Sequence, residues 1–215
     1  FEHVEPEAVG NERTMVASEL SGRGTILAKA EAFGLDIDDP DVVARILARL
    51  KELEHRGYHF EVADASLRLL MERELGIHRP LFDLESYRVI SEERSDGALA
   101  TEATVKLVHD GARLLATAEG NGPVHALDNA LRGALGERVP ELALIELVNF
   151  KVRILDESHG ADATIRVLIE SSNGVESWGS IGVSENVIGA SWEALVDSIE
   201  HGVRRTAAAR HTSSA

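Results

Sequence analysis

Two glycines, Gly120 and Gly122, stand where a strand pattern changes into a helical one. Apolar residues precede them, and from Val124 onward apolar residues recur on one helical face. Glycines at a strand-to-helix turn let backbone N–H groups approach a ligand, and the start of a helix favours negative charge. The segment Gly120–His125 is therefore a candidate site for a small anion such as a carboxylate. An isolated pair of glycines would more simply permit a tight turn.

A second copy of this arrangement follows later in the chain. The hexapeptide Glu102–Leu107 is similar to Asp162–Val167, and each is followed by a further strand-like segment. A glycine turn and an amphipathic helix then complete each copy, with the second turn at Gly182–Asn186. A duplicated unit of this kind builds a pseudo-twofold module with its special turns close together. Such a module can hold one small molecule between its halves, or it can serve only as a stable core.

The remaining pattern predicts an α+β fold. Helical periodicity continues to about residue 78, and one helix begins at Asp39 and Pro40, a typical N-cap and first helical residue. From Leu81 the period changes to two, and Asp110-Gly111 and Asn173-Gly174 are hairpin turn signals. We predict a helical linker subdomain over residues 1–80 and a duplicated βββα domain over 81–205, with helices on one side of its sheets. Residues 206–215 are expected to form a disordered tail.

Composition narrows the classes of partner and environment. The 215 residues carry a formal net charge of −15, which argues against nucleic acid and anionic membranes as partners. The chain has no cysteine, no stretch long enough for a transmembrane helix and no signal peptide at its start. We therefore expect a cytoplasmic protein. Because the sequence begins at Phe1 and not at methionine, we also expect it to be a piece of a longer chain.

No complete catalytic site is recognisable in the sequence. The nine histidines are scattered, and only His55 and His59 have the spacing of two ligands on one helix face. That pair spans Gly57, where the helix is expected to end, so we interpret it as a surface pair. A nucleophile elbow, a phosphate-binding loop and a metalloprotease motif are all absent. We predict no metal or other cofactor within this chain.

Several longer motifs resemble a known enzyme family. They are VGNERTMVASELSGRG, ADAS at Ala63–Ser66, ATEATVKL, AEGNGPVHALDNAL, FKVRILD and IGVSENVIGASWEAL. Together they resemble the C-terminal region of citramalate synthases and, less closely, of the related α-isopropylmalate synthases. The resemblance covers nearly the whole chain. It implies that the duplicated domain is regulatory and that a catalytic TIM barrel precedes this region in the full protein.

The resemblance also implies an activity and its partners. In this family the barrel condenses acetyl-CoA with a 2-oxo acid, here pyruvate, with the help of a divalent metal. The regulatory domain pairs into a homodimer and binds the end-product amino acid, here isoleucine, for feedback inhibition. A chain without the barrel is expected to be inactive alone. Phe1-Glu2-His3 matches a Tyr-x-His motif of the family except at Phe1, and His3 and Asn11 are possible accessory catalytic residues.

Positions of the family's effector pocket can be carried over to this sequence. The turn of the pocket matches Gly120, Asn121, Gly122, Pro123, Val124 and His125. Its apolar wall matches Leu147, Phe150 and Ile154, with Ala161 or Ala163 as a looser match. Independently of the resemblance, Phe150 and Ile154 lie on one face of the expected strand. Two other functions remain open: the regulatory region of an α-isopropylmalate synthase, and a stand-alone amino-acid-binding or dimerisation module.

Overall fold

The computed structural model describes residues 22–155 and 163–213, with side chains described as far as Ala208. Its first elements are helices: α1 (Arg23–Ala32), α2 (Pro40–His55), the short 3₁₀ helix η3 (Phe60–Val62) and α3 (Asp64–Glu74). The predicted start of α2 is confirmed, because the Asp39 carboxylate accepts a hydrogen bond from the Asp41 amide at 2.8 Å. Buried residues on one stripe of α2, such as Ile46 and Leu50, pack this helical part together.

Two three-stranded antiparallel sheets follow, each with a helix after its third strand. The first unit contains β1 (Asp83–Glu93), β2 (Leu99–His109), β3 (Ala112–Gly120) and α4 (Pro123–Leu135). After the 3₁₀ helix η4 (Pro140–Leu144), the second unit contains β4 (Glu146–Ile154), β5 (Ile165–Ser172), β6 (Ser177–Ser184) and α5 (Val187–Ser213). The predicted α+β fold with a duplicated βββα domain is confirmed.

The similar hexapeptides do not occupy equivalent places in the two units. Glu102–Leu107 lies inside β2, whereas Ala163 and Thr164 precede the first residue of β5. Burial indicates the structural match, since Ala103, Val105 and Leu107 of β2 correspond to Val167, Ile169 and Ser171 of β5. The duplication predicted from the sequence is present, but its alignment on those hexapeptides is out of register.

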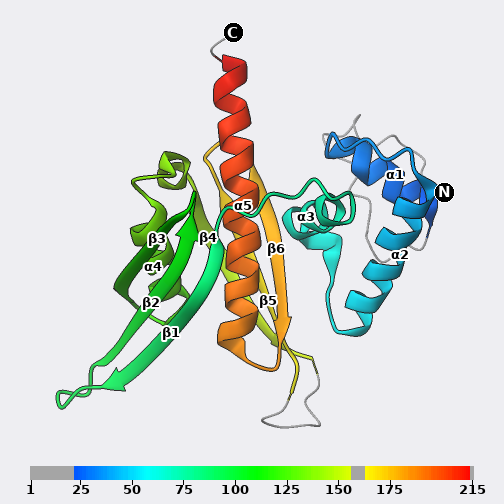
Figure 1. The fold of residues 1–215 in the computed structure, drawn as a ribbon. Helices are drawn as coiled ribbons and strands as arrows, with labels where there is room; N and C mark the ends of the chain where they lie inside the picture. The colour runs from blue at the N-terminus through cyan, green and yellow to red at the C-terminus, as the bar shows by residue number, and fades with distance from the viewer. Residues whose placement is uncertain (1–21, 156–162, 214–215) are drawn as a thin grey trace, which may run out of the picture.

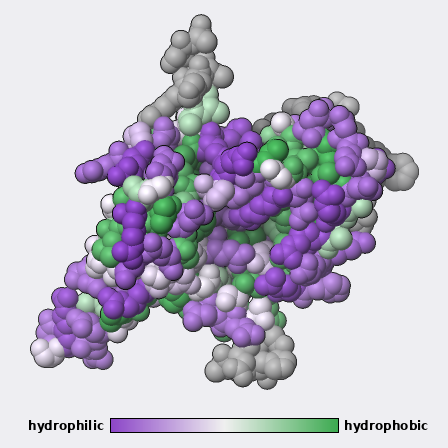
Figure 2. All heavy atoms as spheres, in the orientation of Figure 1, coloured by the Kyte–Doolittle hydropathy of each residue, from purple (hydrophilic) through white to green (hydrophobic). Residues whose placement is uncertain are grey.

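Helix α5 occupies the centre of the molecule. Figure 1 shows it between the β1–β3 sheet on one side and α3 on the other, with β5 and β6 behind it. Both units contribute to the core around it, including Leu107 and Leu131 of the first unit and Ile169 and Leu195 of the second. The side chains of both units therefore form one shared core. The face of the molecule seen in Figure 2 is mostly hydrophilic, with hydrophobic atoms visible among the hydrophilic ones.

The helical part is joined closely to the second unit. Ile181 and Val183 of β6 belong to the same buried cluster as Leu67 and Met71 of α3. The chain then runs without helix or strand from Gly76 to Phe82, across the boundary predicted at residue 80. At the other end, α5 continues to Ser213 and therefore through most of the segment 206–215 that we expected as a tail.

Candidate functional site

The turn between β3 and α4 contains two glycines with different structural roles. A Cβ atom on Gly120 would lie 2.3 Å from the backbone nitrogen of Ala126, far inside any real contact distance. Glycine is therefore required at position 120 so that α4 can pack against the end of β3. The predicted role of Gly120 in ligand binding has this purely structural alternative.

Gly122 is not explained by the fold in the same way. Its φ of 179° is extended backbone that any residue adopts, and an added Cβ would meet nothing within 4 Å. Gly122 is the N-cap of α4 and provides no side-chain hydrogen bond to the helix. The first-turn amides of a helix have no intrahelical partner and lie at the positive end of its dipole. The space beside Gly122 therefore suits a carboxylate.

A cavity of about 720 Å³ lies beside this turn, between α4 and β4. Six residues predicted from the sequence share its wall: Gly122, Pro123, Val124, His125, Leu147 and Phe150. Asn121 belongs to the same turn but does not line the cavity, and its backbone N–H donates to Nδ1 of His125 at 3.2 Å. The turn and the apolar strand positions were separate predictions, and the structure brings them to one site.

Five further residues line the cavity and were not predicted: Asp128, Arg132, Ala143, Ile145 and Glu146. Nε of Arg132 donates to both carboxylate oxygens of Asp128 at 2.9 Å, and its Nη1 donates to the Leu142 carbonyl at 2.7 Å. Asp128 is buried although it carries charge. The sequence contained one sign of this buried carboxylate. Asp128 stands between Leu127 and Ala130 on the apolar face of α4, four residues before Arg132.

The other predicted site residues lie elsewhere. Ile154 is at the far end of β4 and is 57 % exposed, outside the cavity wall. Ala163 is buried just before β5 and does not line the cavity either. Ala161, His3 and Asn11 lie outside the described residues. Gly122–His125, Leu147 and Phe150 thus form the part of the predicted site that comes together.

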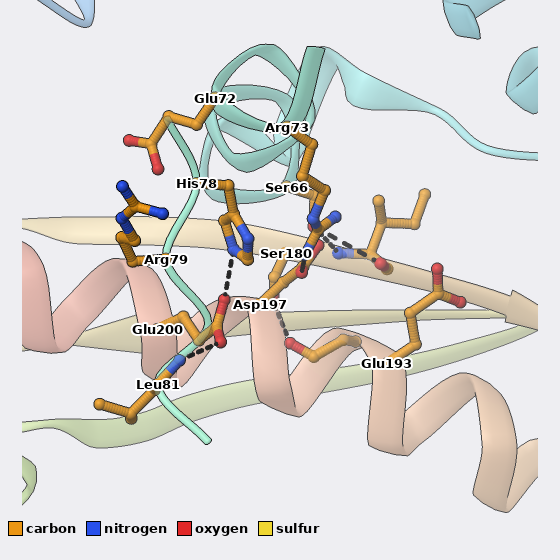
Figure 3. A network of polar contacts seen from close by, with 12 residues as sticks. Ser66, Glu72, Arg73, His78, Arg79, Leu81, Ser180, Glu193, Asp197 and Glu200 are labelled. Atoms are coloured by element: carbon orange, nitrogen blue, oxygen red, sulfur yellow. Dashed lines mark hydrogen bonds and ion pairs between the residues drawn. The ribbon is translucent and has the colours of Figure 1, made fainter. Parts of the chain in front are cut away.

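A network of charged and polar contacts joins α3 to α5, as Figure 3 shows. Arg73 donates to Asp197 at 2.7 Å, and the His78 ring lies 2.9 Å from Glu200. Burial raises the pKa of the Asp197 carboxyl, against the opposing effect of the Arg73 charge. The other Glu200 oxygen accepts the Leu81 amide at 2.7 Å. These contacts fix the helical part on α5, and a smaller cavity of about 210 Å³ lies beside Arg73 and Asp197.

The described ranges do not offer a metal centre. No group of three or more histidine, aspartate or glutamate side chains within them is arranged to hold a metal ion. His59 lies 2.9 Å from Glu61, and His55 is the last residue of α2, as expected for a surface pair. None of the helices in this part of the chain combines the length and apolarity needed to cross a membrane.

Comparisons with known proteins agree with the duplicated domain. Residues 61–203 match the LeuA allosteric (dimerisation) domain. The chain is 49 % identical over 212 residues to the (R)-citramalate synthase of Streptomyces coelicolor, covering 97 % of this chain and 40 % of that protein. It is 48 % identical over 202 residues to the (R)-citramalate synthase of Aquifex aeolicus, covering 93 % of this chain and 38 % of the relative. The chain thus spans about two fifths of the length of these relatives.

Proposed function

Because this chain belongs to the LeuA allosteric (dimerisation) domain family, we propose that it is the regulatory region of an (R)-citramalate synthase. In this proposal, the cavity between α4 and β4 binds the end-product amino acid, isoleucine, and so mediates feedback inhibition. The complete enzyme condenses acetyl-CoA with pyruvate in a catalytic domain outside this chain. The names of the relatives favour this function over the regulatory region of an α-isopropylmalate synthase.

The observation that carries the proposal is the open space at Gly122. The fold requires no glycine there, and yet the residue faces a cavity at the start of a helix. A Cβ atom added at this position would meet no protein atom within 4 Å. The absence of a side chain leaves room for the carboxylate of an amino acid to reach the amides of the first turn.

The rest of the cavity matches the other parts of a branched amino acid. Val124, Leu147 and Phe150 provide apolar surface for an aliphatic side chain. The carboxylates of Asp128 and Glu146 line the same space and provide acceptors for an ammonium group. Isoleucine and valine differ by one methylene, so the cavity is expected to discriminate between them by only about 10–200-fold.

Homodimer formation is the second part of the proposal. Alternate residues of β4, an edge strand, expose apolar side chains on the face that continues the core. Phe150 is 36 % exposed, Val152 43 % and Ile154 57 %. A twofold contact that covers this row is the commonest solution for such a surface. Light scattering of the purified chain at micromolar concentration is expected to give the mass of a dimer, and a monomer mass would contradict this part.

The catalytic metal of the complete enzyme has no place in the described part of this chain. Because the chain spans only about two fifths of the length of its relatives, we expect it to show no acetyl-CoA turnover with pyruvate by itself. A rate above the blank without protein would contradict that expectation.

Calorimetric titration with isoleucine, leucine and valine tests the proposed function. We expect saturable binding with isoleucine tightest, and we expect Gly122→Val to abolish it by occupying the carboxylate position. Gly24→Val is the matched control, because it adds the same side chain at an open position on α1. No heat and no thermal shift with any of the three amino acids, on a folded dimer, would refute the site. Tightest binding of leucine would instead favour the α-isopropylmalate synthase alternative.

A further inference from the structure

A second cavity, separate from the one beside Gly122, lies on the face of the β4–β6 sheet that points away from α5. It has a volume of about 500 Å³ and runs between η3 and the strands. We refer to it as the η3 groove. Its wall is formed by His59, Val62, Asn149, Lys151, Arg153, Arg166, Leu168, Ile169, Glu170, Ser177, Trp178 and Gly179.

Three cations gather on the strand side of the η3 groove. Arg153 of β4 is directly opposite Arg166 of β5, and Lys151 lies two residues before Arg153 on the same strand face. Like charges directly opposite each other on neighbouring strands destabilise a sheet. Although the net charge of the chain is −15, this part of the sheet therefore carries a positive cluster that is unfavourable for its stability.

Among the described residues, in the ranges 22–155 and 163–213, no carboxylate forms an ion pair with Lys151, Arg153 or Arg166 of this cluster. Arg166 instead donates its Nε to the Gly57 carbonyl at 2.6 Å. Burial, and then the charge of Arg153, lower the pKa of the Arg166 guanidinium. Of the described residues on the groove wall, Glu170 is the one carboxylate, and its register partner across the sheet is Asn149.

The fold itself does not demand these charges. In the first unit, the cross-strand pair that corresponds to Arg153 and Arg166 is Ile90 and Glu102. The outer face of the β1–β3 sheet thus lacks the double arginine at the equivalent place. The positive pair is a property of the second unit, which is the unit that carries the groove.

The opposite wall of the η3 groove is held firmly. A Cβ on Gly179 would lie 1.8 Å from the Val62 carbonyl oxygen, so η3 can approach β6 this closely only because residue 179 is glycine. Next to it, the Ile181 amide donates to Oγ of Ser66 at 3.0 Å. The cations on the strands therefore face a fixed wall, and this preorganises the space between them for a ligand.

We propose that the η3 groove binds the phosphate group of a small molecule. Two guanidinium groups and an ammonium group match a phosphate dianion better than a single carboxylate, because arginine presents paired donors to phosphate oxygens. The groove is also much larger than a free phosphate ion, and its volume is in the range of sites for small organic ligands. The ligand class expected is thus a phosphate ester of about nucleotide size.

Calorimetric titration of the purified chain with inorganic phosphate and with adenosine monophosphate tests this proposal. Ionic strength is kept constant with sodium chloride, because exposed charges respond to salt. We expect saturable binding of both probes, and we expect Arg153→Gln to weaken each by about tenfold or more, since it removes a charged hydrogen-bond donor. Tighter binding of the nucleotide identifies an ester as the ligand, whereas equal affinities identify free phosphate.

Arg88→Gln provides the matched control. Arg88 occupies the place of Lys151 in the first unit, is exposed, and carries the same charge. Its replacement is expected to leave phosphate affinity unchanged. Arg153→Gln is also expected to melt no lower than the unmodified chain, because it relieves the repulsion from Arg166. The proposal would be overturned if neither probe bound saturably, or if both substitutions weakened the binding of the probes equally. Titration of the same samples with isoleucine reports separately on the α4–β4 cavity.

Discussion

The two βββα units differ in how they fill one equivalent space. Their helices can be aligned at Gly122 and Asn186, whose carbonyls accept the first helical N–H bond from Ala126 and Ala190 at 2.9 Å. Six residues later the first unit has Asp128 and the second has Trp192. The same helix position therefore carries a carboxylate at the wall of a cavity in one unit and a buried aromatic ring in the other.

The strands that face these two positions correspond as well. The register of β1 shifts after Leu84, and that of β4 shifts after Leu147. Tyr87 and Phe150 each lie three residues after the shift and therefore occupy equivalent positions. Tyr87 stacks on Trp192 with ring centroids 4.9 Å apart, and Phe82 meets the same indole edge-on at 6.1 Å. Phe150 has no such partner on α4 and lines the cavity instead.

The comparison shows how a duplicated scaffold can keep a cavity open in one of two equivalent places. The first strand of each unit faces the helix of the other unit, which leaves two related gaps. Aromatic side chains close one gap and contribute to stability. The other gap stays open because Asp128 is smaller than tryptophan and is held by Arg132. We therefore expect substitutions in the closed gap to change stability and those in the open gap to change binding.

The largest effect is expected from Trp192→Ala in the closed gap. Trp192 is buried against Tyr87 and Phe82, so its removal leaves a large cavity in the shared core. The free energy of unfolding, measured by urea denaturation, should fall by about 3–5 kcal/mol. Trp192→Phe keeps an aromatic ring and should cost clearly less. A loss below about 1 kcal/mol for the alanine variant would show that the closed gap is not a stabilising core.

The next largest effect is a loss of stability in acid, and it depends on His201, which lies in the part of α5 that continues beyond the length of α4. Burial is the largest cause that lowers the pKa of His201 to about 4, with Arg68 and Arg205 adding to it and Glu176 opposing it. Between pH 6.5 and about 4 the unfolded chain binds the proton and the native chain does not. Stability should therefore be lost as the pH falls through this window, by about 3 kcal/mol in total.

Urea denaturation at a series of pH values measures this dependence. His201→Gln should flatten the slope between pH 6.5 and 4, because glutamine does not titrate. Glu176 also loses its favourable contact with Arg205 in acid, but its lowered pKa places that loss at lower pH. A slope that is the same with and without His201 would contradict the assignment.

Much of the fold was predictable from local signals. The Asp110-Gly111 and Asn173-Gly174 turns separate the strands as expected, and Asp39 caps α2. The register of the duplication was not predictable, because alternating hydrophobic hexapeptides look alike whichever strand positions they occupy. Only the hydrogen-bonded pairing shows that Ile165 begins β5 while Val105 is in the middle of β2.

The candidate site was predictable in part. The glycine turn and the apolar strand face were visible, and the structure brings Val124 and Phe150 together. Asp128 and Arg132 were missed, since an i, i+4 ion pair on a helix usually lies on the surface. Burial of this pair depends on η4, whose Leu142 carbonyl accepts from Arg132. Contacts between distant segments are not encoded in the local pattern.

Closing the open gap should remove ligand binding. Asp128→Trp places in α4 the side chain that fills the equivalent space beside α5. We expect the affinity for isoleucine to fall by at least about 100-fold, which corresponds to about 2.7 kcal/mol. Asp128→Asn keeps the volume of the cavity and removes only the charge, so it measures the loss of the ammonium acceptor by itself and should weaken isoleucine binding less than the tryptophan variant does. Calorimetric titration that gives the same affinity for the tryptophan variant and the unmodified chain would place the ligand elsewhere.

The smallest predicted effect separates two residues on one face of β4. Phe150 lines the cavity, but Ile154 lies four residues further along the strand, about 13 Å away. Phe150→Ala should weaken isoleucine binding by about tenfold, since burial of apolar surface contributes roughly 1.5–3 kcal/mol for a whole side chain and Phe150 is only partly covered.

Ile154→Ala should weaken binding less than Phe150→Ala if the ligand contacts only the cavity wall of one chain. The position predicted by family resemblance gives Ile154 a direct role, and a partner chain that covers the exposed β4 face would bring it closer to the ligand. Titration of both variants as dimers and at dilutions where they dissociate distinguishes these cases. If both variants lose the same affinity for isoleucine only as dimers, the binding site extends along β4 to Ile154 in the dimer. If they lose the same affinity at every dilution, the predicted difference between Phe150 and Ile154 is wrong.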